Sequence, residues 1–293
     1  MQVKVEFKDV TLKENDFQIL KPIQLSLTDN KTIGLIGRNG AGKTSLLSLL
    51  ASYRLPTSGQ VLIDGEEAFE NDEKMEQVVF IYPEDYTEET DKVEDILTLM
   101  SRYLPNYDSD YAAHLVERFK LPLDKKVNEL SKGMQSALNV TTGLASRAPI
   151  TIFDEAYLSM DAPSRELFYE ELQEDQIKHP RLIILSTHLV SEAEYLFDEV
   201  AILHKGELLY HEEYDSLVSK GMTITGSKAE VDALVAPYEQ INEKQLGNVK
   251  SVTVFGDEIE ELAEKAENYD MDISSVSLQE LFNHLTEEGQ VHD

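Results

Sequence analysis

The chain has 293 residues, and its 56 acidic and 26 basic side chains give a formal net charge of −30 at pH 7. Nucleic-acid binding depends on a basic surface that neutralises phosphates, so this charge argues against a nucleic-acid partner. The sequence has no cysteine, which excludes disulfide bonds and thiol-based metal or redox chemistry.

Apolar residues make up 41% of the sequence, which is ample for a packed core. No stretch approaches the roughly 20 apolar residues that are needed to span a bilayer. The first ten residues, MQVKVEFKDV, alternate like a strand and contain no apolar secretory segment. We therefore expect a cytoplasmic protein that reaches a membrane only through a partner.

Alternating apolar residues predict strands within the first thirty residues. A short apolar strand at residues 32–36 leads into a glycine-rich segment, and a helix is expected from Ser45 to about Tyr53. The segment VLIDGEE then predicts a hairpin that turns at Asp64 and Gly65.

Further along the chain, residues 86–147 are expected to be mostly helical. Two buried-type strands follow at residues 149–153 and 181–187, and a helix is expected between them over residues 163–178. Strands that alternate with helices in this way predict an α/β core with a parallel sheet.

The character of the sequence changes near Lys220, where short β-like runs begin to alternate with acidic helices. We predict a first domain at residues 1–220 and a small α+β accessory domain at residues 221–293. In the accessory domain, three apolar residues at helical spacing are expected to form part of its own core, namely Ile259, Leu262 and Ala266.

The glycine-rich segment at residues 37–44 reads GRNGAGKT and fits the P-loop pattern, between a strand and a helix. Glycines let successive backbone N–H groups point at a phosphate, and the following helix presents its positive end there. Lys43 is expected to contact the β- and γ-phosphates of a nucleotide, and the Thr44 hydroxyl to bind Mg²⁺.

Residues 150–155, ITIFDE, form an apolar strand that ends in two carboxylates. Asp154 can hold Mg²⁺ beside a P-loop, and Glu155 can orient and deprotonate an attacking water. Taken alone, such an acidic pair after a strand is more often a helix N-cap and its first turn.

Two further segments have the same ambiguity. Residues 130–135, LSKGMQ, form a helix start that can bind phosphate or can simply be an N-cap. The strand at residues 181–187 leads to His188, at the edge where open α/β sheets bind ligands, although a lone histidine there is usually structural.

In this order and spacing, the four segments resemble the nucleotide-binding domain of ABC transporters over roughly residues 2–218. The resemblance implies a P-loop NTPase fold of the ABC type, in which a mixed sheet core carries an antiparallel β subdomain and a helical subdomain at about residues 86–147. The four segments would be, in chain order, the Walker A motif, the signature, the Walker B motif and the switch-histidine loop.

The resemblance also implies individual roles for residues of this chain. The catalytic residues would be Lys43, Glu155 and His188, and Mg²⁺ would be bound by Thr44, Glu84 and Asp154. Ser131, Gly133 and Gln135 would contact ATP on a partner chain, and Asp161 would belong to the D-loop. The residues that would bind ATP are Phe17, Asn39, Gly40, Ala41, Gly42, Lys43, Thr44 and Ser45.

Several positions depart from the family pattern. Glu84 stands where the family more often has glutamine, and Ala156 and Tyr157 stand where a proline usually follows Walker B. The aromatic residue that would stack on adenine is assigned to Phe17, although an alignment without gaps would put Glu14 there.

The function implied is that of the ATP-binding and ATP-hydrolysing subunit of an ABC transporter, with ATP and Mg²⁺ as cofactors. It would power a separate transmembrane permease from the inner face of the cell membrane, and would pair with a second ABC ATPase chain, identical or different. The finer resemblance is to Gram-positive ABC-2-type exporters, which implies export of peptides, antimicrobial ones among them, or other envelope-active compounds.

Two other classes of function were considered. An ABC-type ATPase that acts on nucleic acid or the ribosome is disfavoured by the net charge of −30, because that charge repels phosphate backbones. A regulatory subunit that binds ATP without cleaving it is disfavoured because Glu155 and His188 are both present.

Overall fold

The computed structural model describes residues 3–28, 30–257, 259–269 and 271–287. The chain divides into two compact units. The first consists of Met1–His188 and Tyr195–His211, and the second of Leu189–Glu194 and Glu212–Asp293. Among the described residues, no helix is long and apolar enough to cross a bilayer.

The first unit contains an antiparallel sheet in the order β2-β1-β4-β5. Its strands are β1 (Lys4–Glu14), β2 (Phe17–Thr28), β4 (Ser58–Ile63) and β5 (Glu66–Glu67). The predicted turn between β4 and β5 is confirmed, since Asp64 and Gly65 have φ values of 53° and 82°. Two successive positive φ angles give the tight turn whose twist suits a hairpin.

A six-stranded sheet in the order β10-β9-β3-β8-β7-β6 forms the centre of this unit. The pairs β6/β7, β7/β8, β8/β3 and β3/β9 are all parallel, so the predicted parallel core is confirmed. The strands are β3 (Thr32–Ile36), β6 (Val78–Ile81), β7 (Ile150–Asp154), β8 (Leu182–Thr187), β9 (Glu199–His204) and β10 (Glu207–Glu213).

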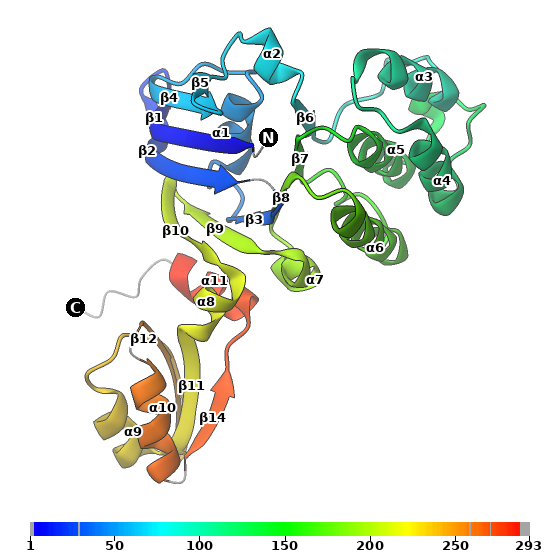
Figure 1. Ribbon diagram of the computed structural model, residues 1–293. Helices are drawn as coiled ribbons and strands as arrows, with labels where there is room; N and C mark the ends of the chain where they lie inside the picture. Colours follow the sequence, from blue (N-terminus) through cyan, green and yellow to red (C-terminus); the bar gives the residue numbers. More distant parts are fainter. Residues whose placement is uncertain (1–2, 29, 258, 270, 288–293) are drawn as a thin grey trace. The chain divides into compact units, whose positions relative to one another are not determined.

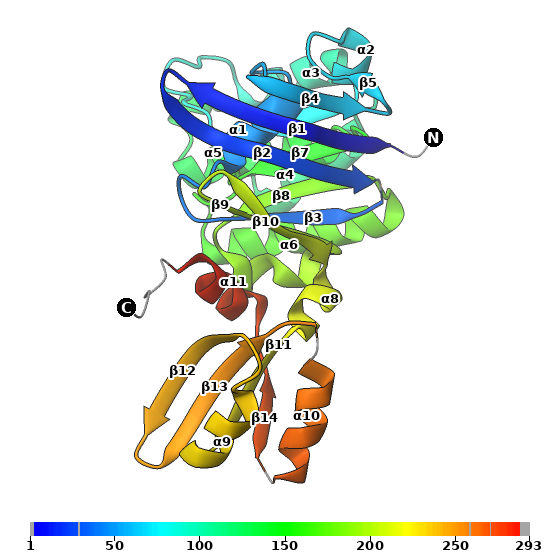
Figure 2. The ribbon, with the colours of Figure 1, turned by 90° about the vertical axis from the view of Figure 1, so that its left-hand side faces the viewer.

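Helix α1 (Lys43–Leu50) packs against both sheets, and Figure 2 shows β1, β2 and β4 lying over it. Four α1 leucines join one apolar cluster with residues of both sheets, so the unit has a shared core. Burying these side chains is the main stabilising contribution to such a layered fold.

The remaining helices of this unit lie mostly beyond β6 and β7, where α3, α4 and α5 form a group (Figure 1). Their bounds are α2 (Asp72–Met75), α3 (Val93–Tyr103), α4 (Ser109–Phe119), α5 (Lys132–Ala145) and α6 (Ala162–Lys178), with 3₁₀ turns at Val127–Glu129 and Glu194–Leu196. Helix α6 matches the helix expected between the two buried strands.

The second unit is a βαββαβ domain with an antiparallel sheet in the order β12-β13-β11-β14, which is the ferredoxin-like arrangement. Its elements are β11 (Gly221–Ser227), α9 (Lys228–Val235), β12 (Gln240–Leu246), β13 (Val249–Phe255), α10 (Ile259–Asn268) and β14 (Asp272–Ser275), with the helices α7 (Val190–Ala193), α8 (Tyr214–Ser219) and α11 (Leu278–Thr286) added.

Helices α9 and α10 cover one face of this sheet. That face carries Ile224, and the same apolar cluster includes Ile259, Leu262 and Ala266, so their predicted place in the domain's own core is confirmed. The opposite face of β11 carries threonines, as expected from the alternation of side chains along a strand.

A buried ion cluster ties α6 to the central sheet of the first unit. Asp175 on α6 accepts a hydrogen bond of 2.7 Å from Arg181 and also pairs with Arg147. Arg181 donates in addition to the Thr151 hydroxyl on β7, over 3.1 Å. Burial lowers the pKa of the Arg181 guanidinium to about 10. Each charge in the cluster therefore depends on the others for compensation.

We predict that Asp175→Asn destabilises the first unit by about 3–5 kcal/mol, because it removes the carboxylate from the buried Arg181 guanidinium and leaves Arg147 paired with Asp108. The measurement is the urea midpoint for unfolding of the first unit. Glu174→Gln is the matched control, since Glu174 is exposed and pairs with Lys178 on the surface of α6. Equal midpoints for the two variants would contradict the proposed role of the cluster.

Candidate nucleotide site

Four parallel strands deliver the candidate residues to one edge of the central sheet. In the register of the sheet, Ile36 lies beside Thr187, Asp154 beside Ser186, and Phe153 beside Ile81. The segments that follow these strand ends therefore meet at the carboxyl edge, where open α/β sheets bind ligands. They are the P-loop, His188, the acidic pair and the loop that carries Glu84.

The P-loop has the backbone conformation that its glycines allow. Gly40 and Gly42 have φ values of 80° and 106°, and a Cβ on Gly37 would lie 2.6 Å from the Leu203 carbonyl oxygen. Gly42 is also the N-cap of α1, and no side chain caps this helix end. The first N–H groups of α1 are therefore available to an anionic ligand.

Lys43 lies at the centre of the site, and its side chain is only 6% exposed. Its ammonium donates to the Gly37 carbonyl oxygen over 2.7 Å and lies 3.3 Å from Glu155 Oε1. The same carboxylate oxygen is 3.1 Å from His188 Nδ1. The three residues predicted to be catalytic, Lys43, Glu155 and His188, are thus brought together by one carboxylate oxygen.

Glu155 occupies an unusual backbone conformation, with φ at 53°. A left-handed φ at a residue other than glycine costs free energy and is enriched at functional sites. The Glu155 N–H donates to the Ser186 carbonyl oxygen over 3.2 Å, which fixes the residue at the end of β7 against β8. The N-cap explanation of this acidic pair therefore does not account for Glu155.

Asp154 has the unsatisfied oxygen that a cation ligand should have. Its side chain is buried, and Oδ1 has no hydrogen-bond partner within the described part of the chain. The hydroxyl of Ser186, the neighbouring residue on β8, is likewise buried without a partner. Hard oxygen donors of this kind suit Mg²⁺, so the residues present fit the metal. Thr44, exposed in the first turn of α1, would add a third oxygen.

Ser186 was not among the site residues predicted from sequence. The motif Ser186-Thr187-His188 drew attention to its histidine alone. A hydroxyl at the end of a buried strand, one register position from Asp154, is the signal that would have identified Ser186.

No contact with Lys43, Glu155 or His188 decides the roles of Phe17 and Glu84. Phe17 begins β2 with 72% of its surface exposed, and it pairs with Glu14 across the β1–β2 turn. The strand then passes the P-loop, since a Cβ on Gly42 would lie 2.7 Å from Leu20. Glu84 is exposed on the loop after β6. The adenine-stacking role of Phe17 and the magnesium role of Glu84 stay predictions.

The signature segment opens helix α5, with Ser131 as its N-cap. The Ser131 hydroxyl accepts from the Met134 N–H over 3.2 Å, and a Cβ on Gly133 would lie 3.1 Å from the Ser159 carbonyl oxygen in the D-loop. Ser131 is exposed, whereas Gln135 is buried and donates to the Val127 carbonyl oxygen over 3.0 Å. Gln135 therefore holds the start of α5 in place within its own chain.

The D-loop keeps its shape without the usual proline. Ala156 and Tyr157 are fully buried, and the Tyr157 ring stacks on Phe168 with centroids 5.2 Å apart. Asp161 is the N-cap of α6 and accepts from the Ser164 N–H over 3.0 Å. These hydrogen bonds from Ser164 lower the pKa of the Asp161 carboxyl.

Comparison with known proteins decides the family. Residues 20–158 match the sequence profile described as "ABC transporter". The putative ABC transporter ATP-binding protein AlbC of Bacillus subtilis is 31% identical over 205 residues, which is 67% of this chain and 85% of AlbC. The chain belongs to the ABC transporter family. It is an ATP-binding, ATP-hydrolysing subunit of that family, which uses ATP and Mg²⁺.

Other ABC proteins extend the comparison. The ABC transporter ATP-binding protein YtrB of Bacillus subtilis is 24% identical over 73% of each chain, and a Nod factor export ATP-binding protein of Burkholderia orbicola is 28% identical over 69% of this chain and 68% of its own. A solved ATP-binding subunit of an ABC transporter matches with a TM-score of 0.64 and 22% identity, over 90% of this chain and 99% of its own. The predicted ABC fold is thereby confirmed. ATPase subunits of this family form dimers and work with transmembrane permease subunits.

We predict that Gly42→Ala weakens Mg-ATP binding by at least about tenfold, because a left-handed φ alone costs alanine about 1–2 kcal/mol. The new methyl group would also lie 2.7 Å from Leu20 Cδ2 and displace the P-loop. Isothermal titration with Mg-ATP gives the affinity. Gly65→Ala is the matched control, because Gly65 has φ at 82° with no atom within 4 Å of the added Cβ. Wild-type affinity in Gly42→Ala would refute the placement of ATP at this loop.

Proposed function

We propose that this ABC ATPase drives export through a separate permease, with Glu155 as the general base of ATP hydrolysis. The observation that carries the catalytic assignment is the shared position of Glu155 Oε1 between the Lys43 ammonium and His188 Nδ1. Relatives that are named as export proteins support the direction of transport, among them the Nod factor and exotoxin translocation subunits.

The proposed chemistry assigns a task to each residue of the site. Lys43 binds the β- and γ-phosphates, and Asp154 and Thr44 would hold Mg²⁺, which would neutralise charge at the phosphates. Glu155 orients the attacking water and accepts its proton, because its carboxylate is already held at the edge of the sheet. His188 lies against Glu155 and keeps this carboxylate in position.

We also propose that two ATPase chains complete each other's sites. Ser131 is an exposed N-cap, and its hydroxyl and the Gly133 backbone are suited to contact phosphates on a second chain. A similar cassette that has been solved as a dimer after hydrolysis, with ADP and Pi, supports this arrangement. The exposed D-loop residue Asp161 is assigned to the same interface.

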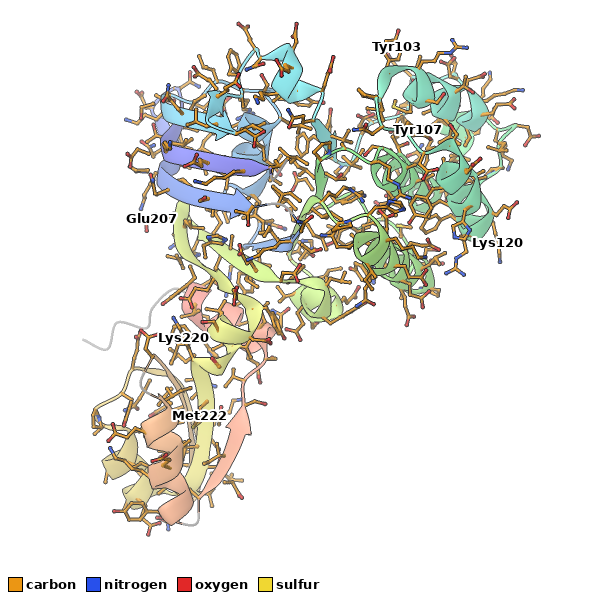
Figure 3. The ribbon with its side chains drawn as sticks, in the orientation of Figure 1. Tyr103, Tyr107, Lys120, Glu207, Lys220 and Met222 are labelled. Atoms are coloured by element: carbon orange, nitrogen blue, oxygen red, sulfur yellow. The ribbon has the colours of Figure 1, made fainter. Side chains whose placement is uncertain are left out.

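The helical group α3–α5 is the surface that we assign to the permease. Tyr103, at the end of α3, is 75% exposed and projects from this group (Figure 3), and Leu99 on the same helix is also exposed. Tyr86, in contrast, is half-buried and donates to Asn139 over 2.5 Å, so it anchors the loop after β6 to α5. Burial raises the pKa of Tyr86, which keeps its hydroxyl protonated as the donor.

The transported compound is proposed to be a peptide or another envelope-active compound, antimicrobial peptides included, on the resemblance to ABC-2-type exporters. The site of action is proposed to be the inner face of the cell membrane, where a permease would hold this subunit. Relatives that are named as ATP-binding proteins of transporters support this location.

We predict that Glu155→Gln lowers the rate of ATP hydrolysis by about 10²–10⁴-fold, the usual contribution of a general base. The amide keeps the size of the side chain, so Mg-ATP should still bind. Phosphate release gives the rate, and light scattering with Mg-ATP is expected to show a shift from monomer to dimer. Glu73→Gln, an exposed carboxylate on α2, should keep the wild-type rate.

Two outcomes would contradict these assignments separately. A near-wild-type rate in Glu155→Gln would remove Glu155 from the role of general base. A variant that binds Mg-ATP and remains monomeric would show that the second ATPase chain is a different protein, or that assembly requires the permease.

A further inference from the structure

The second unit contains a polar cleft that nucleotide binding does not use. It has a volume of about 580 Å³, within the range of cavities that bind small molecules. One wall is the sheet face opposite to α9 and α10, and the other is helix α11. Twelve of its thirteen lining residues are polar or charged, and Val276 is the exception.

The sheet wall carries two rows of polar side chains. In one row Asn242, Thr253, Thr223 and Ser274 are neighbours on successive strands, and in the other Lys244, Ser251 and Thr225 are neighbours. The threonine hydroxyls of the first row lie 2.9 Å apart, and the Thr225 and Ser251 hydroxyls lie 2.6 Å apart. Each hydroxyl can donate one hydrogen bond and accept two, so these pairs leave bonding capacity for a ligand.

The helix wall is equally polar. Glu280, Asn283, His284 and Glu287 of the helix α11 region follow one another at the spacing of a single helical face. His284 Nδ1 is enclosed without a hydrogen-bond partner among the described residues, and the Glu287 carboxylate lies 3.8 Å away. An enclosed nitrogen without a partner costs free energy that a ligand or water would recover.

An ordinary solvated sheet face does not account for this arrangement. Leu281, beside Glu280 on α11, packs against the end of β11, because a Cβ on Gly221 would lie 2.7 Å from Leu281 Cδ2. Gly221 therefore permits the close approach that turns an open polar face into a walled cleft. Both walls of the cleft are polar, and apolar side chains do not fill the space between them.

The charges in the cleft indicate the class of ligand. Among the described residues Lys244 has no ion pair, and the Glu287 carboxylate lies 3.8 Å from the His284 nitrogen. Glu280 is already engaged by the Ser277 hydroxyl and N–H at the start of α11. One cation on the sheet wall and one carboxylate on the helix wall suit a ligand with separated opposite charges.

We propose that this cleft binds short hydrophilic peptides with free termini. The peptide carboxylate is bound by Lys244, the terminal ammonium by Glu287, and the peptide amides by the threonine and serine hydroxyls. The volume exceeds that of one amino acid, and the described lining has no Phe, Tyr or Trp ring on which a sugar could stack. The site lies wholly in the second unit, so it does not depend on the proposed catalytic roles.

The test uses the purified full chain and a tripeptide mixture made from Gly, Ala, Ser, Thr, Asn and Gln with free termini. Equilibrium dialysis followed by mass spectrometry is expected to show retained tripeptides. The same mixture with acetylated and amidated termini should not be retained. Lys244→Gln is expected to weaken retention by about tenfold, because a hydrogen bond to a charged group is worth roughly 1.5–3 kcal/mol.

The double variant Thr223→Val/Thr225→Val removes two hydroxyls from the sheet wall and preserves strand shape, so it should also reduce retention. Lys228→Gln, an exposed lysine on α9 outside the cleft, should keep it. Thermal unfolding and Mg-ATP binding show that each variant is folded. No retention, equal retention of the capped mixture, unchanged retention in both cleft variants, or displacement by the disaccharide trehalose would overturn the proposal.

Discussion

The active arrangement depends on one carboxylate oxygen, Glu155 Oε1, which lies within 3.3 Å of the Lys43 ammonium and 3.1 Å of the His188 ring. These groups come from three different strand ends, and each would have other partners if the sheet order changed. A left-handed φ at Glu155 is stable only because the surrounding sheet fixes it. The parallel core therefore holds the proposed general base, Glu155, in a strained backbone conformation.

Much of this could be predicted from the sequence, because the signals were local. The glycines of the P-loop, the apolar strand before Asp154 and the helix over residues 163–178 are all patterns of adjacent residues. The pairing of Glu155 with Lys43 is not local, since it depends on β3 and β7 both lying against β8. The resemblance to a known family implied that Lys43 and Glu155 share one site, but the contact between them was not predicted.

What could not be predicted depended on side-chain direction and on contacts that are distant in sequence. Gln135 belongs to the signature segment, yet its side chain is buried against Val127. Ser186 looked like part of a histidine motif, although its hydroxyl lies at the register position beside Asp154. In the second unit, the sequence indicated an α+β domain, but the walls of its cleft come from β11–β14 and α11, whose pairing no short pattern reveals.

The division of the chain into two units passes directly beside the switch histidine. His188 is the last residue of the first unit before Leu189–Glu194, which belongs to the second. Within the second unit this segment is held by α11, since the Leu278 and Gln279 N–H groups bond to the Glu194 carboxyl. Burial outweighs these bonds and raises the pKa of Glu194. The backbone of Leu189–Glu194, directly after His188 in the chain, is therefore fixed by contacts within the second unit.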